Sequence, residues 1–156
     1  METTIKHTNI YFSEKIRELI FDIITFLFII LFVYTAASKI ITFSEFVNVL
    51  RHSPLLGKVN LLVAYSIPSV EILLSVVLIV NKTKKIGLVL SLILMVIFTI
   101  YLIYMVSLGG KLPCMCGGVI SMFTWKQHIW FNILFILIAI SGLMIQKKNK
   151  VLLPKK

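Results

Sequence analysis

The chain has 156 residues, the length of one domain; 59% are hydrophobic and only 14% are charged. Soluble domains are typically about 45–50% apolar and about 25% charged. With a mean hydropathy of +1.01, this composition excludes a soluble enzyme, a disordered tail and a coiled coil. The net charge of +10, from 16 lysines and arginines against 6 acidic residues, is therefore better analysed as a signal of membrane orientation than of nucleic-acid binding.

Four apolar runs are long enough to cross a bilayer as helices, which takes about 20 residues. They lie at about 19–41, 61–80, 86–108 and 129–145. Each is apolar on all sides, whereas strands of a membrane barrel alternate. We therefore predict an all-α, integral membrane four-helix bundle. The first run exceeds the apolar segment of a signal peptide, about 7–15 residues, so we expect it to be a retained helix.

The cations are unevenly divided between the two ends of these helices. Three lie in the N-terminal tail (1–18), three in the turn at 81–85 and five in the C-terminal basic tail (146–156), against four in the other two loops. Cytoplasmic loops carry the excess of Lys and Arg. We therefore predict a multi-pass protein of the bacterial inner membrane with both termini in the cytoplasm and the loops 42–60 and 109–128 facing the periplasm.

The first outer loop contains a helical pattern. Phe43, Phe46, Val47 and Leu50 recur at spacings of three and four residues, as an amphipathic helix requires. Pro54 stops such a helix. We expect a short interfacial helix at about 43–52, lying at the outer membrane surface.

The second outer loop holds the two cysteines of the chain, Cys114 and Cys116, between Pro113 and Gly117. An oxidising compartment favours disulfides, but a bond across Cys-x-Cys closes so small a ring that it adds little stability. Strained and exposed disulfides are readily reduced. The pattern therefore favours a redox couple over a structural crosslink.

Three alternatives for the cysteines stay open at this point. Buried cysteines often act as small apolar side chains. Cys-Met-Cys also offers soft ligands for Cu(I), to which Met105, Met122 and His128 could add. In a third alternative the chain is a non-enzymatic membrane scaffold or escort subunit for an exported partner, and its cysteines are structural.

The fourth apolar run starts with a polar and aromatic face formed by Trp125, His128 and Asn132, spaced by three and four residues. An imidazole near the cysteines lowers the pKa of a thiol and so sets its exchange rate. We therefore expect His128 to assist the thiol chemistry, with Trp125 and Asn132 shaping its pocket. An interfacial belt of aromatic side chains is the alternative reading.

The second apolar run contains a carboxylate, Glu71, one turn after Pro68. Acidic residues inside a membrane are costly unless protonated or paired, and such residues indicate function. Asn60, Ala64, Pro68, Glu71 and Ser75 form one small or polar stripe, which predicts a face turned into the bundle. Lys39 is a candidate partner, but upright helices would place Glu71 roughly 12 Å deeper. A direct pair requires tilted helices or a helix starting near Gly57. Otherwise Lys39 extends outward to the interface, and Glu71 is a protonated acid with a hydrogen-bond partner such as Thr35 or Tyr104.

These motifs together resemble a known family over roughly residues 19–145. The segments Ala36–Lys39, Ile67–Glu71 and Pro113–Gly117, followed by Trp125 and His128, are similar to the MauE branch of the DoxX-like four-helix membrane proteins. The resemblance implies a redox-associated membrane protein that helps to form disulfides in an exported protein, alongside a thioredoxin-like partner. Cys114 and Cys116 then correspond to the redox pair.

We therefore predict an inner-membrane thiol–disulfide redox protein whose partner is a thioredoxin-like or other cysteine-containing periplasmic protein, with no nucleic acid. A partner thiolate attacks the disulfide, and a second cysteine resolves the mixed disulfide. The wider similarity to DsbB and vitamin K epoxide reductase adds a quinone as a candidate electron acceptor, although no residue demands one. The sequence indicates no metal site beyond the Cu(I) alternative and no particular oligomeric state.

Overall fold

The computed structural model describes residues 2–107 and 125–152, and their side chains over 14–107 and 126–146. The described chain is helical and contains no strand, which confirms the predicted all-α class. In order, the elements are α1 (Glu2–Ile41), α2 (Phe43–His52), the short 3₁₀ helix η1 (Gly57–Val59), α3 (Asn60–Ile79), α4 (Lys84–Ser107) and α5 (Trp125–Leu152).

Four of these elements are long and apolar enough to cross a bilayer. The spans are Glu14–Ile41, Gly57–Ile79, Lys84–Ser107 and Lys126–Gln146. The helices α1 and α5 continue well beyond the expected limits of 19 and 145, into both tails. Residues 2–41 contain no Gly or Pro, and the polar residues Lys, Glu and Arg favour helices about as well as most apolar ones. The four spans make the protein a multi-pass membrane protein in contact with the lipid bilayer.

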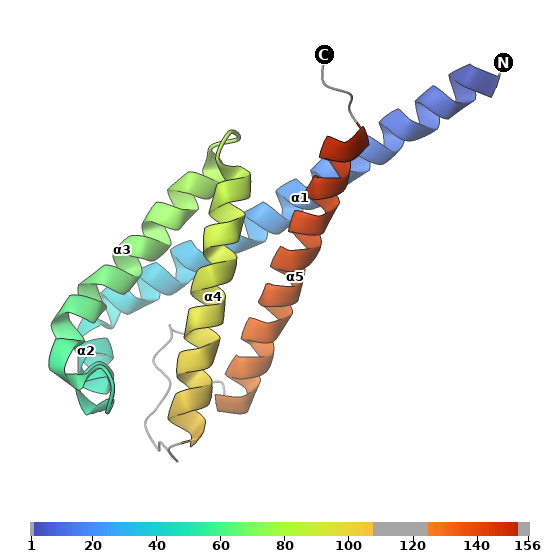
Figure 1. Ribbon diagram of the computed structural model, residues 1–156. Helices are drawn as coiled ribbons and strands as arrows, with labels where there is room; N and C mark the ends of the chain where they lie inside the picture. Colours follow the sequence, from blue (N-terminus) through green and yellow to red (C-terminus); the bar gives the residue numbers. More distant parts are fainter. Residues whose placement is uncertain (1, 108–124, 153–156) are drawn as a thin grey trace.

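The helices pack as a bundle in which α1 runs obliquely (Figure 1). Helix α3 lies along α1, and α4 packs between α3 and α5. Phe28 and Phe32 of α1 are almost wholly buried, and the ring of Phe135 on α5 meets Phe28 edge-on at a centroid distance of 5.4 Å. Aromatic rings in this geometry attract one another in addition to filling space, so they fix α1 against α5.

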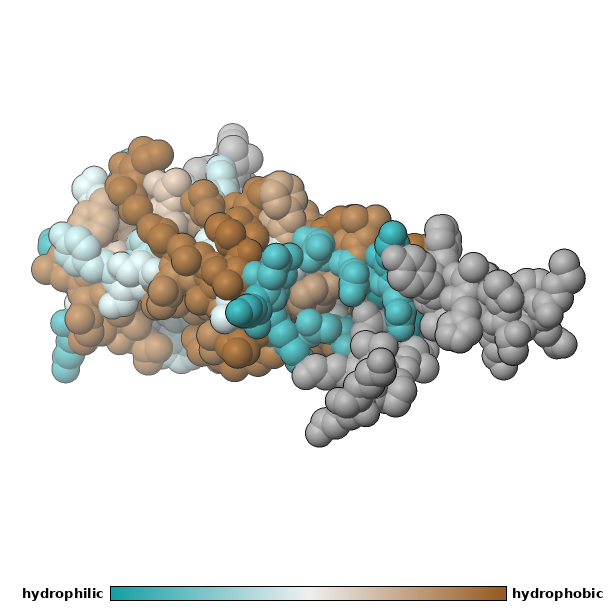
Figure 2. Space-filling view, turned by 90° about the horizontal axis from the view of Figure 1, so that it is seen from above, coloured by the Kyte–Doolittle hydropathy of each residue, from teal (hydrophilic) through white to brown (hydrophobic). Residues whose placement is uncertain are grey.

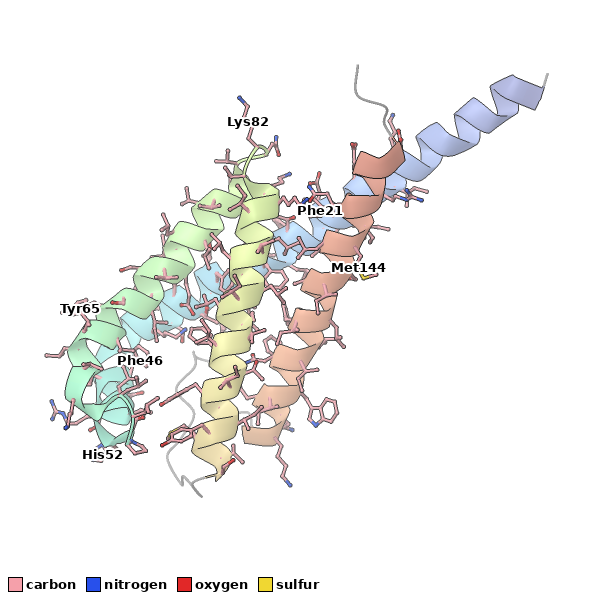
Figure 3. All side chains as sticks on the ribbon, viewed as in Figure 1. Phe21, Phe46, His52, Tyr65, Lys82 and Met144 are labelled. Carbon is pink, nitrogen blue, oxygen red and sulfur yellow. The ribbon has the colours of Figure 1, made fainter. Side chains whose placement is uncertain are left out.

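The end of the bundle that carries the α3–α4 turn is polar. Seen from this end, hydrophilic residues gather around the turn and apolar residues cover the sides (Figure 2). Lys82 extends away from the bundle (Figure 3), while Lys84 Nζ donates to Asp22 Oδ1 at 2.8 Å and so links α4 to α1. Asp22 thus has a partner that sequence reasoning did not identify, although a partly exposed pair of this kind stabilises little.

At the opposite end, α2 folds back onto the start of α3 (Figure 1). The apolar face predicted from the spacing is buried: Phe46 and Leu50 pack against Ala64 of α3, and Figure 3 shows Phe46 at this junction. The hydroxyl of Tyr101 on α4 lies 3.1 Å from Ser53 Oγ, just after α2 ends. The short helix therefore packs on the start of α3, and Ser53, which follows it, links this end of the bundle to α4.

We predict that Gly57→Ala destabilises this end of the bundle. A Cβ on Gly57 would lie 2.8 Å from the carbonyl oxygen of Arg51, which is backbone and cannot rotate away. Such overpacking costs about 1–3 kcal/mol. Thermal unfolding in detergent measures the loss.

The control for this substitution is Gly142→Ala on α5, where the nearest contacts are the ends of the Ile24 and Leu88 side chains at 3.2 Å. Side-chain ends can move by a few tenths of an ångström, so we expect a smaller loss. Equal losses at the two glycines would show that the close approach at Gly57 does not matter.

Candidate functional site

Helix α3 turns its polar stripe into the bundle, as the spacing predicts. Ala64, Pro68, Glu71 and Ser75 are all buried. Glu71 retains only 1% of its exposure, although it lies near the middle of the span. A carboxylate this deep must be paired, because the surrounding hydrocarbon offers no hydrogen bonds.

The partner of Glu71 is Lys39. Its Nζ lies 2.7 Å from Oε1 and 3.0 Å from Oε2 of the carboxylate, and 3.4 Å from the carbonyl oxygen of Thr35. Lys39 is 5% exposed, so both charges are removed from water and from lipid. Lys39 therefore points inward and does not extend to the membrane surface.

The two charges meet because the helices are not upright. Helix α1 is inclined relative to α4 and α5, and α3 follows it (Figure 1). The membrane-spanning segment that contains Glu71 also begins at Gly57, because η1 leads directly into α3. Either condition would allow a direct pair, and the structure has both, so the depth difference calculated for upright helices does not apply.

Helix α5 contributes a second polar group to the same region. His128 and Asn132, one turn apart, are 6% and 3% exposed. Between them Phe131 meets the imidazole edge-on, with ring centroids 6.4 Å apart. Trp125 is the first residue of α5. The face predicted from the 125, 128, 132 spacing is therefore turned into the bundle at His128 and Asn132.

A small cavity brings these groups together. Thr35 and Lys39 of α1, Glu71 of α3, and His128 and Asn132 of α5 all line it. Its volume is about 50 Å³. The remaining walls are apolar or aromatic and come from Leu31, Phe32, Met95, Phe98, Leu102 and Phe131.

The size of this cavity decides what it can hold. An apolar cavity of about 150 Å³ accommodates benzene, and a water needs only a tenth of that. Because the volume here is about 50 Å³, water fits, whereas a ring the size of a quinone requires side chains to move. The residues that line this cavity do not fit a quinone as placed, so we do not assign the cavity to one.

The predicted cysteine site, with Pro113, Cys114, Cys116 and Gly117, lies outside the described residues. The described residues on either side of it, Ser107 and Trp125, end α4 and begin α5. Both lie at the α2 end of the bundle (Figure 1). His128 is in the first turn of α5 and therefore belongs to the same end.

Sequence reasoning missed that the intramembrane pair and the α5 face share one cavity. It treated Lys39 and Glu71 as one feature and His128 and Asn132 as another. Thr35, which lines the cavity, was considered as a partner of Glu71 together with Tyr104, and the latter is 41% exposed. Over the part of the chain that the structure describes, no three His, Cys, Asp or Glu side chains gather in a way that could hold a metal ion.

The helices and the buried polar cavity define the class: an all-α membrane protein with four membrane-spanning helices and an ion pair in its core. A family model described as methylamine utilisation protein MauE matches residues 17–145. Since this match covers most of the chain, the protein belongs to the MauE family. Comparisons with curated proteins and with solved structures gave no match.

We predict that Glu71→Gln strongly destabilises the bundle, because it leaves the ammonium group of Lys39 buried without a counter-charge. Breaking a buried pair by removing one partner costs about 3–5 kcal/mol. Unfolding by denaturing detergent in mixed micelles measures the change.

The double variant Lys39→Met/Glu71→Leu removes both charges and keeps apolar volume in their place. Replacing a whole buried pair in this way is often neutral or stabilising, so we expect it to recover most of the loss. If the double variant is as unstable as Glu71→Gln alone, the unpaired charge of Lys39 is not the cause of the lost stability.

Proposed function

We propose that this protein is a thiol–disulfide redox protein of the bacterial inner membrane that assists the maturation of an exported protein in methylamine utilisation. Cys114 and Cys116 form the redox pair and face the periplasm, with both chain termini in the cytoplasm. The observation that carries the proposal is the MauE match over residues 17–145, which includes the Pro-Cys-x-Cys-Gly segment.

The position of His128 supports this proposal. The cysteines belong to the connection from Ser107 to Trp125, and His128 follows within the first turn of α5. An imidazole close to a thiol stabilises the thiolate, which is the reactive form. His128 therefore assists the thiolate chemistry, while Trp125 and Asn132 shape its surroundings, and Pro113 and Gly117 set the backbone around the pair.

The chemistry is an exchange of bonds between sulfur atoms. A thiolate of the partner attacks one sulfur of the Cys114–Cys116 disulfide, so a mixed disulfide forms and the other cysteine leaves as a thiolate. The partner's second thiolate then attacks the mixed disulfide. The partner becomes oxidised, and two electrons and two protons reach Cys114 and Cys116. The disulfide of a thioredoxin-like protein restores the pair by the same exchange in reverse.

We predict that the single variants Cys114→Ser and Cys116→Ser trap a partner. With one cysteine removed, the remaining thiolate attacks the disulfide of the thioredoxin-like partner and displaces one of its sulfurs as a thiolate. The mixed disulfide then lasts longer, because the second cysteine that would resolve it is absent. Non-reducing electrophoresis of membranes from the native host, followed by mass spectrometry, identifies the adduct.

The double variant Cys114→Ser/Cys116→Ser is the matched control and must give no adduct. The redox proposal is wrong if neither single variant forms an adduct and the double variant matures the exported proteins of its host normally. Full function without either cysteine would instead favour the scaffold alternative.

We predict that a thiol reagent unable to cross the membrane labels Cys114 and Cys116, after reduction, from the periplasmic side of intact spheroplasts. The excess of lysines and arginines in the tails and the 81–85 turn is the physical reason for this orientation. Labelling that appears only after the membrane is opened would reverse the orientation.

A further inference from the structure

The cavity at the centre of the bundle contains a charge pair that already satisfies itself. Lys39 Nζ has three acceptors, the two carboxylate oxygens of Glu71 and the carbonyl oxygen of Thr35. The pair carries no net charge. A ligand that occupied this cavity would therefore meet no unbalanced ion, which points to a neutral molecule.

Asn132 lines the same cavity from α5, but its hydrogen bonding differs from that of the ion pair. It is 3% exposed and lines the cavity, yet its amide makes no hydrogen bond with any residue in the described parts of the chain. An amide that faces a cavity without a partner is unfavourable where the surroundings cannot form hydrogen bonds. Native proteins satisfy such groups with protein or with ordered water.

Size and chemistry together select the missing partner. It must donate to the amide oxygen or accept from the amide nitrogen, it must be neutral, and it must fit about 50 Å³. Buried waters typically make about three hydrogen bonds and occupy polar cavities of this kind. Thr35, Glu71 and His128 supply further polar surface on the same walls.

We propose that this cavity is a hydration site within the bilayer, in which water bound by Asn132 bridges α5 to the Lys39–Glu71 pair. The ion pair joins α1 to α3, and the water adds α5, so three membrane-spanning helices share one hydrogen-bonded network.

The test is the reactivity of single cysteines placed in the cavity of the full-length protein in lipid nanodiscs. Cys114 and Cys116 are first replaced by serine, so the result does not depend on the proposed redox function. Asn132→Cys is then treated with hydrogen peroxide, which is small enough for the cavity, and oxidation of the thiol is followed. Thiols react as thiolates, which form where water is present, so we expect modification about tenfold faster than at the two control positions described next.

The matched controls are Ala139→Cys and Leu134→Cys on the same helix. Ala139 is fully buried in the apolar core, and Leu134 is 54% exposed on the outer, lipid-facing surface. Thr35→Cys, a change of little volume, samples the cavity from α1 and decides the question if Asn132→Cys does not fold. The proposal is wrong if the cysteine in the folded cavity variant is modified no faster than the cysteine in either control. An apolar molecule from the bilayer that filled the cavity would give this result.

Discussion

The bundle depends on one ion pair inside the bilayer. Lys39 and Glu71 each carry a charge that hydrocarbon cannot solvate, and only their mutual distance of 2.7 Å makes their burial tolerable. This constraint holds α1 and α3 at one depth relative to each other. Apolar packing alone would allow these two helices to slide, because lipid tails solvate their outer faces as well as protein does.

Much of the fold follows from hydropathy and spacing. The four spans, the short helix at 43–52 and the inward stripe of α3 all derive from periodicities within one segment, which the sequence displays directly. Such periodicities give the face of a helix but neither its tilt nor its neighbours. The pairing of Lys39 with Glu71 was therefore undecided, and the meeting of Asn132 with Thr35 around one cavity was not foreseen. Both depend on how inclined helices cross.

The proposed redox pair and the buried polar cavity are linked through helix α5. The redox pair proposed at Cys114 and Cys116 connects α4 to α5, and the buried polar cavity begins one turn into α5 at His128. His128 belongs to both. Helix α5 therefore follows this connection in the chain and contributes His128 and Asn132 to the cavity.

The junction between α1 and α2 has a mechanical consequence. Thr42 alone separates the two helices, and it is hydrogen-bonded on both sides, from its N–H to Ser38 O at 2.9 Å and from Phe46 N–H to its own carbonyl at 3.0 Å. These hydrogen bonds restrict movement of α2 relative to α1. Lys39 lies three residues before Thr42, so a displacement of α2 would be transmitted to the ion pair through a continuously hydrogen-bonded backbone.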